Sequence, residues 1–332
     1  SVAYTNNTDA GTATATLFAN GDDTNYVGSK EVRFTIQKRP VTVNTANQEI
    51  VFGAMLSSDL AHDATLATLA GACNGHTISF VVLSAPRNLG IGTHLDVITA
   101  SDVQIQDADH NDVTANYLIT QGTKGNLTVT PKSTDGLTIS GLNDEYEGDG
   151  VTSVKPDELL TENVALYDGT YRLQKDVDYT VSYTNNTKAG TATATFTFKE
   201  GGNYNSSADP LTKNFTIYYR VTTFGGKVSA DKNYATYYNA DESLEVKDAN
   251  SEVYYCKLSG TGDNKVAELH KVTSKVISAG NAVMLETPST VNSVKLYASD
   301  NTTETYTGNV LTGVTETSEV DAANKFYIFD GD

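Results

Sequence analysis

One stretch of the sequence has the residue types of a cation-binding loop. Residues 107–112 read Asp-Ala-Asp-His-Asn-Asp, which places oxygen donors at alternating positions, as a calcium loop does. A complete loop also needs glycine at its sixth position and a bidentate glutamate at its twelfth, and here these positions hold Asp112 and Leu118. We therefore expect a polar turn between strands and predict no metal site, with calcium binding by Asp107–Asp112 left open.

The remaining candidates for chemistry are scattered. Residues 143–149 form a second acidic stretch, which we expect to be a solvated loop rather than a metal site. No metalloprotease motif and no G-x-S-x-G nucleophile elbow is present, and nothing nominates a carboxylate pair for glycoside hydrolysis. We predict no catalytic residue, no cofactor and no enzyme activity. The histidines, of which no two are four residues apart, are His62, His76, His94, His110 and His270.

The two cysteines, Cys73 and Cys256, fall in different predicted modules. A disulfide would require their Cα atoms to lie within about 7 Å of each other. We expect two free thiols instead, because an unpaired cysteine usually behaves as a small buried hydrophobic residue.

Three pairs of adjacent tyrosines could contribute to a binding surface. Neighbouring positions on a strand point to opposite faces, so one ring of each pair could face solvent and stack on a sugar. The simpler expectation is that such a tyrosine covers its neighbours while its hydroxyl stays hydrated. Sugar binding therefore remains open, and the ligand-binding residues are unknown. The pairs are Tyr218–Tyr219, Tyr237–Tyr238 and Tyr254–Tyr255.

The composition predicts an all-β protein and excludes several classes of function. The chain is rich in threonine and has 19 tyrosines but no tryptophan, and threonine and tyrosine both favour strands. Its net charge of −18, without a basic cluster, argues against nucleic-acid binding. The longest apolar run, around Ile78–Leu83, is too short to span a bilayer. A length of 332 residues predicts several small domains.

An internal repeat organises the chain. Residues 4–16 and 183–195 match at 12 of 13 positions, differing only at Asp9 and Lys188. In the second copy, residues 177–183 and 191–198 alternate apolar and polar residues around an Asn- and Gly-rich turn, which predicts a hairpin. Residues 215–219 supply a further strand. The duplication predicts that the same structural unit occurs twice.

The repeat suggests four segments. We predict that residues 1–38 are the second half of a β module whose first half lies upstream of Ser1, which would leave an apolar face uncovered. No signal peptide is present, so we expect that one has been removed or that the chain was cut from a longer one. The other predicted segments are a β module at 39–132, a complete module of the first type at 133–219, and a C-terminal β domain at 220–332.

Some elements can be placed within these segments. Residues 57–72 are the one helical candidate, with Ser57 or Ser58 as the N-cap. Residues 117–120 and 127–132 predict a closing hairpin for the second segment. Residues 325–329 predict a strand near the end of the chain. The fold class that we expect is a series of small Ig-like β-sandwich modules in an elongated array, with one short helix.

Several stretches resemble known modules. Residues 178–186 with 189–193 resemble a repeat of secreted and surface proteins of Bacteroides-like gut bacteria, and residues 111–117 with 125–130 resemble the related MBG-type module. Residues 234–237, 277–285 and 309–314 are similar to a C-terminal β domain of the same bacteria, although that family usually has proline where Ser278 stands. The resemblance implies Ig-like or related small β folds of adhesins and large surface proteins. It implies no catalytic residues.

These observations favour a non-catalytic, adhesin-like or stalk protein that is secreted or displayed at the cell surface. The alternatives are a carbohydrate-binding accessory protein of a glycan-utilisation system and the scaffold part of a larger enzyme. We expect a monomer that spans no membrane and binds an extracellular protein or a glycan, but no nucleic acid. The sequence leaves open the ligand, the residues that precede Ser1 and the number of modules in the native chain.

Overall fold

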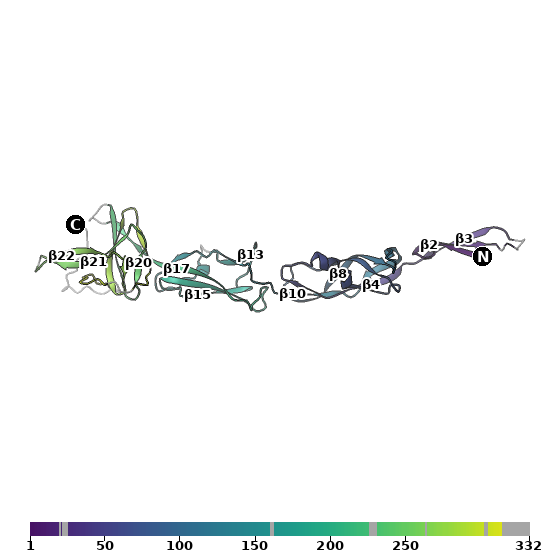
Figure 1. The fold of residues 1–332 in the computed structure, drawn as a ribbon, viewed down its shortest axis with the longest axis horizontal. Coiled ribbons are helices and arrows are strands. Elements are labelled where there is room, and N and C mark those ends of the chain that lie inside the picture. Colours follow the sequence, from purple (N-terminus) through teal and green to yellow (C-terminus); the bar gives the residue numbers. More distant parts are fainter. Residues whose placement is uncertain are drawn as a thin grey trace. The chain divides into compact units, whose positions relative to one another are not determined.

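The computed structural model describes residues 1–19, 21, 26–159, 163–225, 231–262, 264–301 and 305–313. Strands form 52% of the structure and helices 5%, so the predicted all-β class is confirmed (Figure 1). The chain divides into two compact units, Ser1–Asp135 with Phe198–Ala208, and Gly136–Thr197 with Asp209–Asp332. No helix among the described residues is long and apolar enough to cross a membrane. The strand predicted at 325–329 lies outside the described residues.

The first unit begins with a three-stranded antiparallel sheet in the order β1-β2-β3. Its strands are β1 (Val2–Thr5), β2 (Gly11–Phe18) and β3 (Ser29–Ile36). The turn between β1 and β2 places Asn6 at φ 51° and Gly11 at φ 141°, conformations that asparagine tolerates and glycine adopts readily. The predicted hairpin is therefore present in the first copy of the repeat.

The rest of the first unit is formed mainly by two sheets with a common core. The first has the order β5-β10-β8-β7 and the second the order β6-β4-β9. Val43, Val81, Ile98 and Leu127 are fully or almost fully buried between their strands. The strands are β4 (Arg39–Thr45), β5 (Gln48–Val51), β6 (Ala67–Ala70), β7 (Thr77–Ser84), β8 (Gly92–Gln106), β9 (Tyr117–Gln121) and β10 (Gly125–Thr130).

The prediction that residues 117–120 and 127–132 form a closing hairpin is wrong. The strand β9 pairs in parallel with β4 in one sheet, whereas β10 pairs with β5 and β8 in the other. The chain crosses between the sheets at residues 122–124, where the Gly125 N–H donates to Thr45 Oγ1 at 2.8 Å. A Cβ on Gly125 would lie 2.1 Å from the Ala46 carbonyl oxygen. Turn residues between two apolar runs mark a change of direction, but they do not determine which strand becomes the partner.

The helical candidate at 57–72 is confirmed in a shorter form. The helix α1 (Ser58–His62) is followed by a 3₁₀ turn, η1 (Ala64–Leu66). Ser57 is the N-cap, and its hydroxyl accepts a hydrogen bond from the Leu60 N–H at 3.2 Å. The helical pattern ends because residues 67–70 pair with β4 as strand β6.

The second copy of the repeat lies in the second unit and repeats the pairing of the first. Ala192 faces Phe215 across β16 and β17, just as Ala13 faces Phe34 across β2 and β3. Asn185 repeats the positive φ of Asn6, at 54°. The strands are β11 (Thr138–Ser140), β12 (Glu145–Glu147), β13 (Ala165–Asp168), β14 (Tyr171–Arg172), β15 (Tyr179–Thr184), β16 (Gly190–Phe198) and β17 (Leu211–Thr222).

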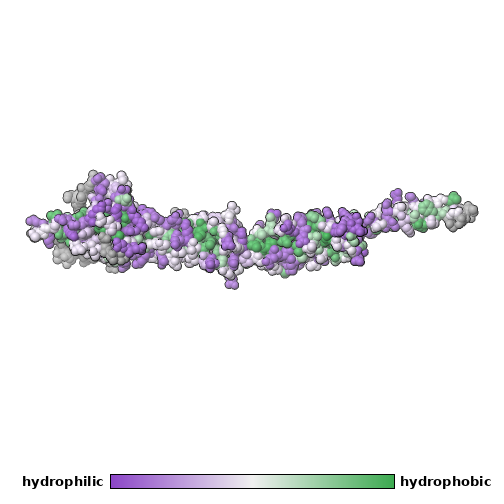
Figure 2. Space-filling model, in the orientation of Figure 1, coloured by the Kyte–Doolittle hydropathy of each residue, from purple (hydrophilic) through white to green (hydrophobic). Residues whose placement is uncertain are grey.

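The two copies differ in the exposure of one sheet face. In the first copy, the pairing registers place Leu17, Phe34 and their apolar neighbours on one face. Leu17 and Phe34 are 45% and 39% exposed, whereas their counterparts Phe196 and Phe215 are 0% and 2% exposed. Figure 2 shows hydrophobic residues at the surface of the N-terminal part. The face that the sequence predicted to be apolar and uncovered is thus exposed.

The C-terminal β domain has two sheets around a second core. One contains part of β17 with β25, β20 and β23, and the other has the order β18-β19-β24-β21-β22. Leu244, Val253, Val283 and Leu296 are completely buried between them. The strands are β18 (Phe224–Gly225), β19 (Lys232–Asn239), β20 (Leu244–Val246), β21 (Glu252–Ser259), β22 (Val266–Lys271), β23 (Val276–Ile277), β24 (Asn281–Pro288) and β25 (Ser293–Ala298).

Candidate functional site

The strand β17 belongs to two modules at once. Its first part pairs with β16 from Leu211 to Ile217, inside the second copy of the repeat. Its last part, Tyr219 to Thr222, pairs with β25 of the C-terminal domain. The strand therefore passes the predicted boundary at 219/220 without a linker. One sheet continues from the second repeat module into the C-terminal domain. We refer to β12, β17 and β25 with their side chains as the shared-strand junction.

Charged side chains connect strand β12 of this junction to β17 and β25. Glu145 on β12 accepts a hydrogen bond from Lys295 Nζ on β25 at 2.7 Å. Glu147, two residues further, accepts one from Arg220 Nε on β17, also at 2.7 Å. These carboxylates come from the acidic stretch that was expected to be a solvated loop. That expectation is wrong, because residues 145–147 form a strand that pairs in parallel with β17. Its middle residue, Tyr146, is buried.

Two adjacent tyrosines occupy the centre of the junction. Lys295 Nζ lies 4.2 Å from the centroid of the Tyr218 ring, a cation–π geometry. On the other face of the strand, the Tyr219 hydroxyl donates to Glu242 Oε2 at 2.5 Å and accepts from the Ala189 N–H at 3.0 Å. Burial is the main cause that raises the pKa of Tyr219. Both residues are only 7% exposed, so neither tyrosine offers the solvent-facing surface considered for a sugar.

The Glu145–Lys295 contact predicts a pH dependence of stability. The hydrogen bond from Lys295 lowers the pKa of Glu145 below its ordinary value of 4.5. A carboxyl group whose pKa is lower in the folded than in the unfolded state contributes stability that is present above the unfolded pKa and is lost as the pH falls through the folded pKa. The two side chains are 40% and 42% exposed, so we expect the pair to contribute at most about 1 kcal/mol.

Thermal unfolding of the wild type and the Glu145→Gln variant between pH 7 and pH 3 measures this contribution. We expect the variant to melt earlier at pH 7 and the difference to disappear at the acidic end. The control is Asp241→Asn, because Asp241 is an exposed residue of the C-terminal domain. A difference between wild type and Glu145→Gln that persists at pH 3 would contradict the assignment.

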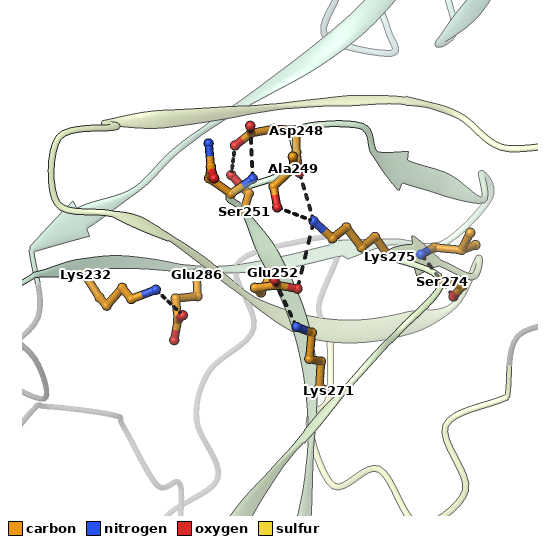
Figure 3. A network of polar contacts seen from close by, with 11 residues as sticks. Lys232, Asp248, Ala249, Ser251, Glu252, Lys271, Ser274, Lys275 and Glu286 are labelled. Carbon is orange, nitrogen blue, oxygen red and sulfur yellow. Dashed lines mark hydrogen bonds and ion pairs between the residues drawn. The ribbon is translucent and has the colours of Figure 1, made fainter.

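A second polar network lies on the C-terminal domain, on the sheet that contains β19, β24 and β21 (Figure 3). Lys232 Nζ donates to Glu286 at 2.9 Å, and Lys271 Nζ lies 3.0 Å from Glu252. Lys275 Nζ donates to the backbone oxygens of residues 248 and 249, both at 3.0 Å, and lies 3.9 Å from Glu252. Glu286 thus pairs with one lysine and Glu252 with two. Through Lys275 the network also fastens the loop at residues 248 and 249.

The candidate calcium loop is folded around its own first carboxylate. Asp107 Oδ1 accepts the N–H groups of Asp109 and Asn111, both at 2.9 Å, and the Asn111 side chain binds both carboxylate oxygens. These hydrogen bonds, chiefly those from Asn111, lower the pKa of Asp107. Asp112 accepts the N–H of Thr114 at 2.9 Å. The described part of the chain brings together no group of three or more His, Cys, Asp or Glu side chains that could hold a metal ion.

The two cysteines are far apart in the sequence, and the histidines lie in several different environments, one of which includes Cys73. Cys73 is exposed, Cys256 is buried, and both are free thiols. His76 Nδ1 lies 2.8 Å from the Tyr117 hydroxyl, which also accepts the Cys73 N–H at 3.1 Å. His270 stacks on Tyr255 with ring centroids 5.3 Å apart. The rings of His62 and His94 lie 3.4 Å and 2.8 Å from the backbone oxygens of Val81 and Gly90. For His110, it is the backbone N–H that donates to the Asp107 carbonyl oxygen.

The remaining tyrosine pairs are half-buried on both sides of their strands. Tyr237 and Tyr255 pack against the core of the C-terminal domain. A Cβ on Gly313 would fall within the ring of Tyr238, so the backbone of residue 313 lies directly on that ring. Tyr254 is on the outer face, and burial is the main cause that raises its pKa. These pairs thus serve mainly to cover the two faces of the sheet.

The residues of the shared-strand junction come from three separate parts of the sequence. Sequence reasoning placed Tyr218 and Tyr219 on a strand, but the roles of Glu145, Arg220 and Lys295 were missed. Their only signal was the charge complementarity between an acidic strand and two basic ones, which becomes visible once the pairing is known. No protein-family model and no curated protein matches this chain.

Proposed function

We propose that this protein is a non-catalytic, secreted or cell-surface modular protein, and that the second repeat module and the C-terminal domain act together as a stiff spacer. The observation that carries the proposal is strand β17, whose 12 residues serve both modules. Adhesins and stalks need such spacers, because a binding function has to be held away from the cell.

The junction resists bending for a physical reason. A flexible linker bends by rotating backbone dihedral angles that make no contacts, whereas bending β17 at residue 219 would break its ladder with β25. Each net hydrogen bond in such a ladder contributes about 0.5–1.5 kcal/mol. The contacts of Glu145 with Lys295 and of Glu147 with Arg220 would be lost at the same time. The two modules are therefore expected to move as one body.

Distance measurements between spin labels test this proposal. Labels at the exposed positions Tyr171 and Val266 report on the two sides of the junction, with the exposed Cys73 replaced by serine. We expect a single narrow distance distribution. Replacing Val221 with proline removes a ladder donor from β17, and we expect this variant to give a broad distribution. A broad distribution in the wild type would show that the junction is a hinge and would overturn the spacer role.

Surface display is tested separately. Antibody labelling of intact source cells is expected to detect the protein without permeabilisation. Labelling that requires permeabilised cells would contradict an extracellular location.

A further inference from the structure

One buried carboxylate in the second repeat module lacks a complete set of partners. Asp157 lies in the 3₁₀ turn η3 (Pro156–Glu158), and its side chain is only 5% exposed. Its Oδ2 atom pairs with Lys175 Nζ, but its Oδ1 atom is buried and has no hydrogen-bond partner. A buried acceptor without a partner destabilises the folded state, and more so when it is charged. Such an atom in a folded protein calls for a partner outside the chain, which is an ordered water or a ligand.

Two cavities meet at this carboxylate. Asp157 and Lys175 line both of them, and each has a volume of about 350 Å³. This volume is within the usual range for small-molecule sites, about 300–1,000 Å³. The first cavity has an apolar base formed by buried Leu173 and Tyr179. Its polar lining includes Asn163, Arg172 and Gln174.

The surrounding structure holds Asp157 in place. The Asp157 N–H donates to the Tyr183 hydroxyl on β15 at 3.3 Å, which fixes η3 against the strand. Arg172 Nη2 donates to Asn163 Oδ1 at 2.7 Å, so these two cavity residues position each other. The orphaned oxygen is thus part of a preformed site on rigid elements, which lowers the entropic cost of binding a ligand.

The charges select the kind of ligand. A cation is disfavoured, because three basic side chains line the two cavities against two carboxylates. The basic residues are Lys155, Arg172 and Lys175, and the acidic ones are Asp157 and Glu158. A ligand rich in hydroxyl groups fits, because one hydroxyl can donate to Asp157 Oδ1 while its neighbour accepts from Lys175, Arg172 or the Gln174 amide.

We propose that the second repeat module binds a sugar residue of a glycan in the cavity at Asp157, with Asp157 Oδ1 accepting a hydrogen bond from a sugar hydroxyl. The site is independent of the spacer role, because none of its residues belongs to the shared-strand junction. It is also distinct from the tyrosine pairs considered on the sequence, since Asp157 is not next to any of them in the chain.

The test is a glycan array printed with neutral and uronic-acid oligosaccharides and probed with the full chain. Asp157→Asn keeps the volume of the side chain and removes its charge. Gln174→Ala removes a lining amide, while the backbone N–H of Gln174 can still donate to Asp178 Oδ2. Asp144→Asn, an exposed position in the same module, is the matched control. Circular dichroism melting of every variant establishes that it is folded at the assay temperature.

We expect the wild type and Asp144→Asn to bind the same oligosaccharides, and Asp157→Asn to bind them at least ten-fold more weakly. Gln174→Ala is expected to weaken the same signals, and this variant decides the outcome if Asp157→Asn does not fold. An array without signal for the wild type, or binding that survives both substitutions, would overturn the proposal. Neither result would affect the spin-label distances, so failure of this site and failure of the spacer role can be told apart.

Discussion

Alanine at Phe196 is expected to destabilise the second repeat module by about 3–5 kcal/mol, the usual cost of removing a buried phenylalanine. The same change at Leu17, its counterpart in the first copy, is expected to cost less than about 1 kcal/mol. Phe196 is completely buried, and the centroid of its ring lies 5.8 Å from that of the Tyr179 ring. Leu17 is 45% exposed, so its truncation removes less apolar surface from contact with the protein.

Hydrogen exchange measured by mass spectrometry gives the local stability of both modules in each variant. Peptides covering β15–β17 should exchange faster in Phe196→Ala, whereas peptides covering β1–β3 should change little in Leu17→Ala. The pairing registers of the two copies are the same, so local strand pairing cannot explain the difference. Equal losses in the two variants would show that the face of the first copy is covered in solution.

Placing a second copy of residues 136–180 directly before Val2 is expected to slow hydrogen exchange in β1–β3 by about 100-fold. In the complete module, this segment supplies the buried residues Leu142, Tyr146, Leu166 and Leu173. Burying one apolar side chain contributes about 1.5–3 kcal/mol. Leu17 and Phe34, together with Val2, Tyr4 and Val32 on the same face, are 39–56% exposed. Covering all five should therefore contribute at least about 3 kcal/mol, which corresponds to this factor.

The control for this fusion carries Leu166→Asp in the added segment. Leu166 is completely buried in the complete module, and a charge at that position should prevent the segment from packing. We expect exchange in β1–β3 to return to the rate of the original chain. If the unaltered fusion leaves exchange unchanged, the exposed face does not accept this layer, and the two copies differ in more than their coverage.

Several elements could be predicted because their signals are local. The alternation of Ala192, Ala194 and Phe196 with threonines identifies strand β16 without reference to any other part of the chain. The Asn and Gly residues of the repeat turn indicate positive φ, and the structure has it at Asn6 and Asn185. The cap at Ser57 was also predictable, because a capping hydroxyl bonds within its own first turn.

Errors arose where the partner of a strand is distant in sequence. The hairpin predicted from residues 117–132 failed because β9 and β10 pair with β4 and β5, which lie about 80 residues earlier. The acidic residues 145–147 were taken for a loop because three residues are too few for a period-2 pattern. Their pairing with β17 depends on residues 216–218.

The candidate sites follow the same division. The Asp107 loop could be interpreted in advance, because its hydrogen bonds join residues within four positions of one another. Glu145 and Lys295, which form an ion pair, are 150 positions apart in the sequence. Asp157 contacts Lys175 only because η3 lies beside the turn after β14. Contacts of this kind leave no periodic signal in the sequence.

The sequence by itself determined the all-β class, the duplicated hairpin and its turn conformations, and the apolar face of the first copy, because side-chain alternation and backbone preferences act over a few residues. Only the tertiary structure decided that β17 joins two modules in one sheet, and that the carboxylate of Asp157 is buried with one oxygen unpaired. Both outcomes depend on which distant strands pack together, and that choice is made by the burial of the whole module.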